Sequence, residues 1–176
     1  LREIAAKAIQ ANVKALEEVS ISFQKGSIHA VLGENGAGKS TLMGLLAGFA
    51  QPDQGQIIAH GSVAMVHQHF CLVPAFSVAE NVALAVTARL PERLALNARI
   101  GRAKQISESL GWQLDWDAIT GDLPVGIQQR VELVKALQTE SDVLILDEPT
   151  AVLTPDEVAE LFNVLRRLRD SGICVI

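Results

Sequence analysis

The sequence predicts an α/β fold with a mostly parallel sheet core and a helical subdomain in the middle of the chain. Hydrophobic residues fill 49% of the 176 positions and aromatic residues only 4%, a composition typical of the aliphatic strands of buried parallel sheets. Strand and helix patterns alternate near both ends of the chain, as in α/β proteins. We therefore expect a single domain, with a core formed by residues 1–73 and 141–176 and a helical subdomain at 74–140.

Composition and charge argue against several other classes of protein. The formal net charge is −5, which disfavours a basic face that binds nucleic acid. Cys71 and Cys174 lie far apart without the spacing of metal ligands, which favours a reducing compartment. No apolar run of about 18 residues could span a membrane. The charged start, LREIAAKAIQ, does not resemble a signal peptide.

Caps and turn residues set the bounds of the expected elements. Gly48 is a suitable C-cap for an early helix, and Ser77 with Glu80 has the spacing of a capping box. Thr154 as the cap, Pro155 at the first helical position and Glu157 at the third make a strong start for a late helix. Periodicity predicts helices at 40–47, 78–88, 97–110, 127–137 and 155–171, and strands at 28–32, 56–59, 63–66, 143–146 and 173–176. The last helix carries an apolar stripe made of Val158, Leu161, Phe162, Leu165 and Leu168.

A glycine-rich loop, GENGAGKST at residues 33–41, fits the pattern G-x-x-x-x-G-K-[ST] in full. Its glycines let backbone N–H groups point inward, and the following helix adds its positive end. Lys39 would place its charge on the β- and γ-phosphates of a nucleotide, and Ser40 would offer its hydroxyl to Mg²⁺. A chance turn is the alternative, but the expected strand before and helix after the loop favour a phosphate site. The expected nucleotide contacts are Gly33, Asn35, Gly36, Gly38, Lys39, Ser40 and Thr41.

Two carboxylates follow the apolar strand VLIL at residues 143–146. Ligands of α/β sheets bind at this end of the strands. Asp147 suits a role at Mg²⁺ through water, and Glu148, next along the chain, suits a general base for the attacking water. An ordinary acidic pair at a strand-to-loop junction is the alternative.

Three segments, GENGAGKST, LPVGIQQRVELVKAL and VLILDEPTAVLTP, occur in this order and together resemble the ATP-binding subunits of ABC transporters, which are P-loop NTPases. Met65–Leu84, MVHQHFCLVPAFSVAENVAL, is most similar to importers of simple sugars and nucleosides. Their ATPase chain carries two such domains in tandem, and this chain resembles the N-terminal one. The resemblance implies ATP and Mg²⁺ as cofactors.

The resemblance implies a role for Gln68, which falls where a family glutamine touches Mg²⁺ and the attacking water. Ser40, Gln68 and Asp147 are then the expected metal contacts, and Gln68 joins Glu148 as a catalytic residue. His67 and His69 flank Gln68, but no third ligand has a spacing suited to zinc. The apolar positions after Gln68 would face a permease or form core, and both readings stay open for Phe70, Leu72, Val73 and Phe76.

The stretch from Leu123 to Gln128 falls at the family signature, which contacts ATP held by the opposite domain. The residues implied to act there in trans are Val125, Gly126 and Gln128, and an ordinary glycine-capped helix is the alternative. Pro124 replaces the usual serine and offers neither a hydroxyl nor an N–H. The lost bond to phosphate would be worth about 1.5–3 kcal/mol, so we expect the partner's ATP site to be the weaker one.

Other departures concern the ends and the loops. No aromatic residue precedes Phe23 and Ile9 is nearest to the usual adenine-stacking position, so the adenine contact is open. The loop at 61–65 is shorter than the family pattern, and the bend at 151–154 lacks the common aspartate. The chain starts at leucine and stops in a strand, so we expect a fragment truncated at its C-terminus, before the family's switch histidine, with weak hydrolysis on its own.

The function implied is ATP binding and hydrolysis that power the import of a simple sugar or nucleoside. The expected partners are a second ATPase domain, arranged head to tail in the same chain, and permease subunits at the cytoplasmic face of the membrane. Nucleic acid is not expected. The alternatives are a relative with a role in DNA repair or at the ribosome, and a regulatory domain that only binds nucleotide.

Overall fold

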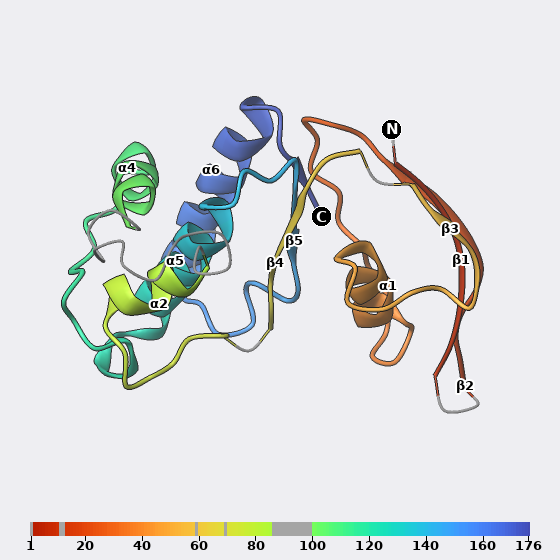
Figure 1. Cartoon of the computed structure of the whole chain (residues 1–176), viewed down its shortest axis with the longest axis horizontal. Helices are drawn as coiled ribbons and strands as arrows, with labels where there is room; N and C mark the ends of the chain where they lie inside the picture. The colour runs from red at the N-terminus through yellow and green to blue at the C-terminus, as the bar shows by residue number, and fades with distance from the viewer. Residues whose placement is uncertain (1, 11–12, 59, 69, 86–99) are drawn as a thin grey trace. The chain divides into compact units, whose positions relative to one another are not determined.

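The computed structural model of the chain describes residues 2–10, 13–58, 60–68, 70–85 and 100–176 (Figure 1). These residues divide into two compact units. The first comprises residues 1–65, 141–147 and 165–176, and the second comprises residues 66–140 and 148–164. The expected subdomain at 74–140 stays a prediction.

The first unit contains an antiparallel sheet that the sequence did not predict. Its strands are β1 (Arg2–Gln10), β2 (Val13–Phe23) and β3 (Gln54–Ile57), in the order β2-β1-β3. β1 pairs with both neighbours and aligns Ile4 with Ile57 of β3. β3 begins two residues before the predicted start at 56, and residue 59 lies outside the described residues.

A second sheet in this unit has the order β4-β5-β6. β4 (Val63–Val66) and β5 (Val143–Leu146) have the predicted bounds, and β6 (Cys174–Val175) lies within the predicted strand. β5 and β6 pair in parallel. All four residues of β5 are buried, so this strand is a fixed support for the two carboxylates that follow it.

The helix after the glycine-rich loop, α1 (Lys39–Leu46), has its C-cap at Ala47, and the predicted stop residue Gly48 follows with a φ of 81°. The N–H groups of Gly48 and Phe49 donate to the carbonyls of Leu45 and Gly44, at 3.1 and 2.9 Å. This pair of bonds is a Schellman motif, which satisfies carbonyls at the helix end. α1 packs into a core cluster formed by Leu16, Phe23, Leu42, Met43, Leu45, Leu46, Val143, Ile145, Cys174 and Ile176.

The predicted buried strand at 28–32 is wrong beyond its first residue. Ile28 forms an isolated parallel bridge with Val175, and His29 donates its N–H to the Val175 carbonyl at 2.8 Å. Leu32 is 90% exposed rather than buried.

The second unit is helical in its described parts. Its elements are α2 (Val78–Leu84), α4 (Gly101–Ser109), a 3-10 turn (Thr120–Asp122), α5 (Val125–Leu137) and the first turns of α6 (Pro155–Asp170). α5 packs against α2 and α4. The predicted helical residues 86–88 and 97–99 lie outside the described residues.

Asn81, in α2, forms hydrogen bonds with segments that precede and follow this helix in the sequence. Its side chain is fully buried, accepts the N–H of Val73 at 2.7 Å and donates to Thr120 Oγ1 at 3.0 Å. The predicted capping box is present, because Ser77 Oγ accepts the Glu80 N–H at 3.2 Å and Glu80 Oε2 accepts the Ser77 N–H at 2.8 Å. The segment that follows Gln68 is therefore anchored to α2.

The predicted apolar stripe of α6 is confirmed at Leu161, Leu165 and Leu168, which are buried. Phe162 is instead 43% exposed, and Val164, which was not predicted, is buried. Positions three and four residues apart share a helix face, and Phe162 lies about 100° away from Leu161. Among the described residues, no helix is both long enough and apolar enough to cross a bilayer.

Candidate functional site

The glycine-rich loop forms an exposed turn between Ile28 and α1. Gly36 and Gly38 take φ values of 83° and 90°, the left-handed region that favours glycine. Lys39 donates from Nζ to the carbonyls of Gly33 and Glu34 at 2.8 and 2.9 Å. The loop thus holds its own cation in place at the start of a helix.

Gly38 is required by packing as well as by its φ. A side chain there would fall closer than van der Waals contact to the Ala15 carbonyl oxygen, and would also crowd Leu16 of β2. By contrast, a side chain at Gly36 would meet nothing within 4 Å. β2 therefore packs directly against the loop at Gly38, the N-cap of α1.

The hydroxyls expected to serve nucleotide or metal lie in the first turn of α1. Ser40 is exposed and Thr41 half-buried, and Asn35 is exposed in the loop before them. The first N–H groups of a helix have no partner within the helix and carry its partial positive charge. These hydroxyls and backbone donors form a surface suited to the oxygens of a phosphate.

The two acids after β5 differ in their surroundings. Asp147 is half-buried and belongs to the same compact unit as the loop, whereas Glu148 is exposed. Glu148 Oε2 accepts a hydrogen bond from Gln68 Nε2 at 2.7 Å. The structure thus brings together the two residues predicted to be catalytic, although they are 80 positions apart.

The sequence left the roles of the residues around Gln68 open. His67 is half-buried and His69 lies outside the described residues. In the described part of the chain, no three His, Cys, Asp or Glu side chains are grouped to hold a metal. Val73 and Phe76 are 37% and 38% exposed, so the core alternative is wrong for both; Phe70 and Leu72 are half-buried.

The signature stretch begins α5, with Pro124 at the N-cap and no side-chain cap bond. The Pro124 carbonyl accepts the N–H groups of Ile127 and Gln128 at 2.9 and 3.0 Å. Gln128 turns back, and its Nε2 donates to the Leu123 carbonyl at 2.8 Å. Val125 is 43% exposed and Gly126 is buried.

Glu157, in the first turn of α6, is a neighbour of the signature that sequence reasoning did not place there. A side chain on Gly126 would overlap Glu157 Oε1. The Thr154 N–H and hydroxyl both donate to Glu157 Oε2 at 2.9 Å. These bonds, first from the backbone and then from the side chain, lower the Glu157 pKa; burial raises it by less, and the Arg130 charge lowers it by a smaller amount still.

Other residues missed by sequence link α5 to its surroundings. Gln129 Nε2 donates to the Pro149 carbonyl at 2.6 Å. Arg130 pairs with Glu160, and Trp112 Nε1 donates to the same carboxylate at 2.6 Å. Gln129 and Arg130 follow the signature stretch directly, which was the available sequence signal. Their partners Pro149 and Glu160 lie 20 and 30 positions away, and Trp112 lies 48 positions from Glu160.

Comparison with known proteins finds one matching family, described as ABC transporter, over residues 16–151. The nucleoside import ATP-binding protein NupA of Lactococcus lactis subsp. cremoris is 42% identical over 92% of this chain. The ribose import ATP-binding protein RbsA of Chelativorans sp. is 41% identical over 93% of it. The chain spans about a third, 35%, of the length of each of these curated relatives.

Solved structures share the architecture. The structure of cbiO1 from Clostridium perfringens, part of the ABC transporter complex cbiONQ, has a TM-score of 0.83 at 28% identity, over 99% of this chain and 76% of that chain. A dimeric ATP-binding cassette in a post-hydrolysis state, bound to ADP and Pi, has a TM-score of 0.86 at 20% identity, over 99% of this chain and 86% of that chain.

Replacement of Gly38 by alanine should destabilise the loop. The left-handed backbone alone costs about 1–3 kcal/mol for other residues, and the new methyl group would meet the Ala15 carbonyl. Gly44→Ala is the matched control within α1, where nothing lies within 4 Å, and it should gain about 0.5–1 kcal/mol. Urea unfolding of the two variants measures the difference; equal effects would contradict the packing argument.

Glu157 should give the chain a pH-dependent stability. Its pKa in the folded chain lies below the ordinary 4.5, so its contribution is present above that value and is lost as the pH falls through the folded pKa. The melting temperature of Glu157→Gln should therefore fall below that of the wild type at pH 7, and the gap should narrow as the pH falls below 4.5. A gap that stays constant over this range would refute the role of the charge.

Proposed function

Since the chain belongs to the ABC transporter family, we propose that it binds and hydrolyses ATP to drive the import of a simple sugar or nucleoside. Membership confirms the resemblance predicted from the motifs, and the solved structures confirm the predicted fold class. The relatives named for nucleoside and ribose import support this choice of solute. The observation that carries the proposal is the direct contact of Gln68 with Glu148, in a chain whose phosphate loop has all of its motif residues.

The phosphate loop would hold the triphosphate. Lys39 already presents its ammonium group at the loop, and a γ-phosphate would replace the two carbonyls that it now contacts. The N–H groups of the loop and of the first turn of α1 would donate to the remaining phosphate oxygens. Asn35, Gly36 and Thr41 complete the proposed contacts within this loop.

The residues proposed for Mg²⁺ fit its chemistry, because Mg²⁺ prefers oxygen ligands and keeps several of its waters. Ser40 offers a hydroxyl, Asp147 a carboxylate and Gln68 an amide oxygen. The bound ion would neutralise charge that develops on the β- and γ-phosphates. Gln68 donates from Nε2 to Glu148, which leaves its oxygen for the ion.

Glu148 is proposed as the general base. Its carboxylate is exposed at the end of a buried strand and can accept a proton from a water that attacks the γ-phosphate. Gln68 would orient both this carboxylate and the water. Because Gln68 opens the segment with the exposed Val73 and Phe76, a permease that contacts this segment could change the position of Gln68 and so the rate.

The proposed partner is a second ATPase domain, arranged head to tail and carried by the same chain. The dimeric cassette with ADP and Pi supports this pairing for the fold. Val125, Gly126 and Gln128 would then face ATP held by the partner, at the cytoplasmic side of the membrane beside the permease. Nucleic acid is not proposed as a partner, in keeping with the net charge of −5.

A regulatory domain that binds nucleotide without turnover is the second candidate. Pro124 favours it, because the N-cap of α5 has no hydroxyl to offer a phosphate. The two candidates differ in one measurement, ATP hydrolysis by the protein assembled with its permease.

Glu148→Gln separates binding from hydrolysis. The variant keeps the size of the side chain and loses the base, so turnover should fall about 10²–10⁴-fold while ATP still binds. Lys39→Ala should instead weaken ATP binding itself. Glu108→Gln, at an exposed position on α4, is the control and should leave both unchanged. Turnover that survives Glu148→Gln would remove Glu148 as the base.

Pro124→Ser tests the proposed weakness of the site completed in trans. A serine at this N-cap can accept an N–H of the first turn, which should stabilise the chain by about 0.5–2 kcal/mol. Its hydroxyl can also reach the partner's phosphate, so ATP-driven dimerisation should strengthen. Pro124→Ala, with no hydroxyl, is the matched control. A gain in stability without any gain in dimerisation would contradict the role in trans.

A further inference from the structure

Glu148 has a strained backbone. Its φ is 49°, a left-handed value seen for few residues other than glycine. Pro149 follows it, and a residue before proline is pushed towards extended backbone. Such a conformation costs about 1–3 kcal/mol and persists only when its surroundings hold it. The contacts that hold this residue are therefore of functional interest.

Three hydrogen bonds converge on Glu148 and Pro149. Gln68 holds the Glu148 carboxylate at 2.7 Å, and the Ala151 N–H donates to the Glu148 carbonyl at 3.3 Å. The third bond, from Gln129 Nε2 to the Pro149 carbonyl, is 2.6 Å long. Of these three, only the Gln129 bond comes from a buried side chain that takes no part in the proposed chemistry.

Burial of the Gln129 side-chain amide carries a free-energy cost. The residue is 4% exposed, and its Oε1 is buried without a hydrogen-bond partner among the described residues. A buried polar atom without a partner costs about 1–3 kcal/mol. An apolar side chain would avoid this cost, so the donor to Pro149 is the feature that an amide supplies here.

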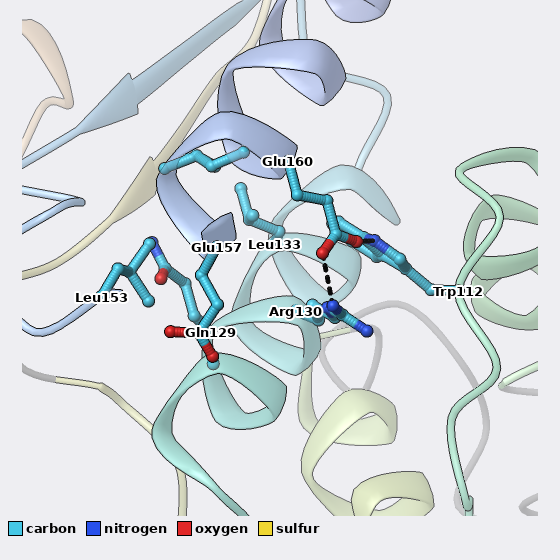
Figure 2. A pocket seen from close by; sticks show the side chains of 9 residues that line it. Trp112, Gln129, Arg130, Leu133, Leu153, Glu157 and Glu160 are labelled. Carbon is cyan, nitrogen blue, oxygen red and sulfur yellow. Dashed lines mark hydrogen bonds and ion pairs between the residues drawn. The ribbon is translucent and has the colours of Figure 1, made fainter. Parts of the chain in front are cut away.

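The surroundings of Gln129 fix its donor in space. Figure 2 shows Gln129 on α5 beside Glu157 and Leu153, with Arg130 and Trp112 converging on Glu160 of α6. The Arg130–Glu160 ion pair is 2.5 Å long. These contacts join α5 to α6 next to Gln129, on the helix that carries the donor.

We propose that Gln129 is a positioning residue that holds the Pro149 carbonyl and thereby keeps Glu148 in its left-handed, base-competent conformation. Gln129 touches neither nucleotide nor water in this scheme and acts only through Pro149. Since Gln129 lies in the first turns of α5, the same helix that presents the signature would also set the base of its own site. This inference rests on the proposed ATPase function.

Gln138 is a matched control in the same helix region. It is also 4% exposed, donates from Nε2 to the Val82 carbonyl at 2.7 Å and has a buried Oε1 without a partner among the described residues. Gln129→Leu and Gln138→Leu therefore each remove one buried amide-to-carbonyl bond. Both should shift the melting temperature by a similar amount, about 2–4 °C.

The two variants should differ in kinetics within the assembled transporter. Gln129→Leu should lower kcat about 10–100-fold with the KM for ATP unchanged, because the phosphate loop is untouched. Gln138→Leu should keep wild-type kcat. Gln129→Glu, which keeps the size but replaces the donor by oxygen, should match Gln129→Leu. Equal kcat values for both leucine variants would overturn the proposal.

A second measurement decides the inference without turnover. Amide hydrogen exchange of the chain should speed up at Ala151 and Leu153 in Gln129→Leu and stay unchanged there in Gln138→Leu. Equal exchange in both variants would overturn the positioning role. If the wild-type transporter hydrolyses no ATP, the proposed function fails, and the exchange comparison still tests whether Gln129 holds this segment.

Discussion

Burial of β5 is the constraint on which the candidate site depends. All four of its residues are buried, and Leu144 and Ile145 have no exposed surface. A strand that is buried on both faces cannot shift along its own axis without drawing the polar residue that follows it into the core, where its charge would lose its water. The first polar residue after it, Asp147, follows directly on this buried strand, and α1 packs on the same core as β5.

The sequence predicted best where local chemistry and burial agree. β4 and β5, the Schellman end of α1 and both capping boxes needed only neighbouring residues, and all are present. The predicted strand at 28–32 is wrong because an apolar run indicates only a preference for burial, whereas a strand also needs a neighbouring strand to pair with. The alternation at Val19, Ile21 and Phe23 of β2 was a usable strand signal, but β1 is less regular because it is rich in alanine.

The candidate site also contains some residues that the local sequence could predict and others that it could not. The glycine-rich loop could be recognised from its spacing, because its proposed phosphate contacts come from the backbone and the glycine positions indicate the path of that backbone. The contact between Gln68 and Glu148 required knowledge of the family, since no local pattern joins two residues 80 positions apart. Gln129 and Glu157 could not be assigned, because their roles depend on the approach of α5 to α6 and on one carbonyl at a strained bend.

The two carbonyl contacts of Lys39 bear on how the chain would distinguish nucleotides. The ammonium group is already stripped of part of its water and held in place, so arrival of a nucleotide exchanges acceptors instead of ordering a side chain. Neutral carbonyl oxygens give way to charged phosphate oxygens, and the gain grows with the charge that the tail brings to that point. A diphosphate brings less charge there than a triphosphate. If the loop binds nucleotide as proposed, it would therefore hold a triphosphate more tightly than a diphosphate.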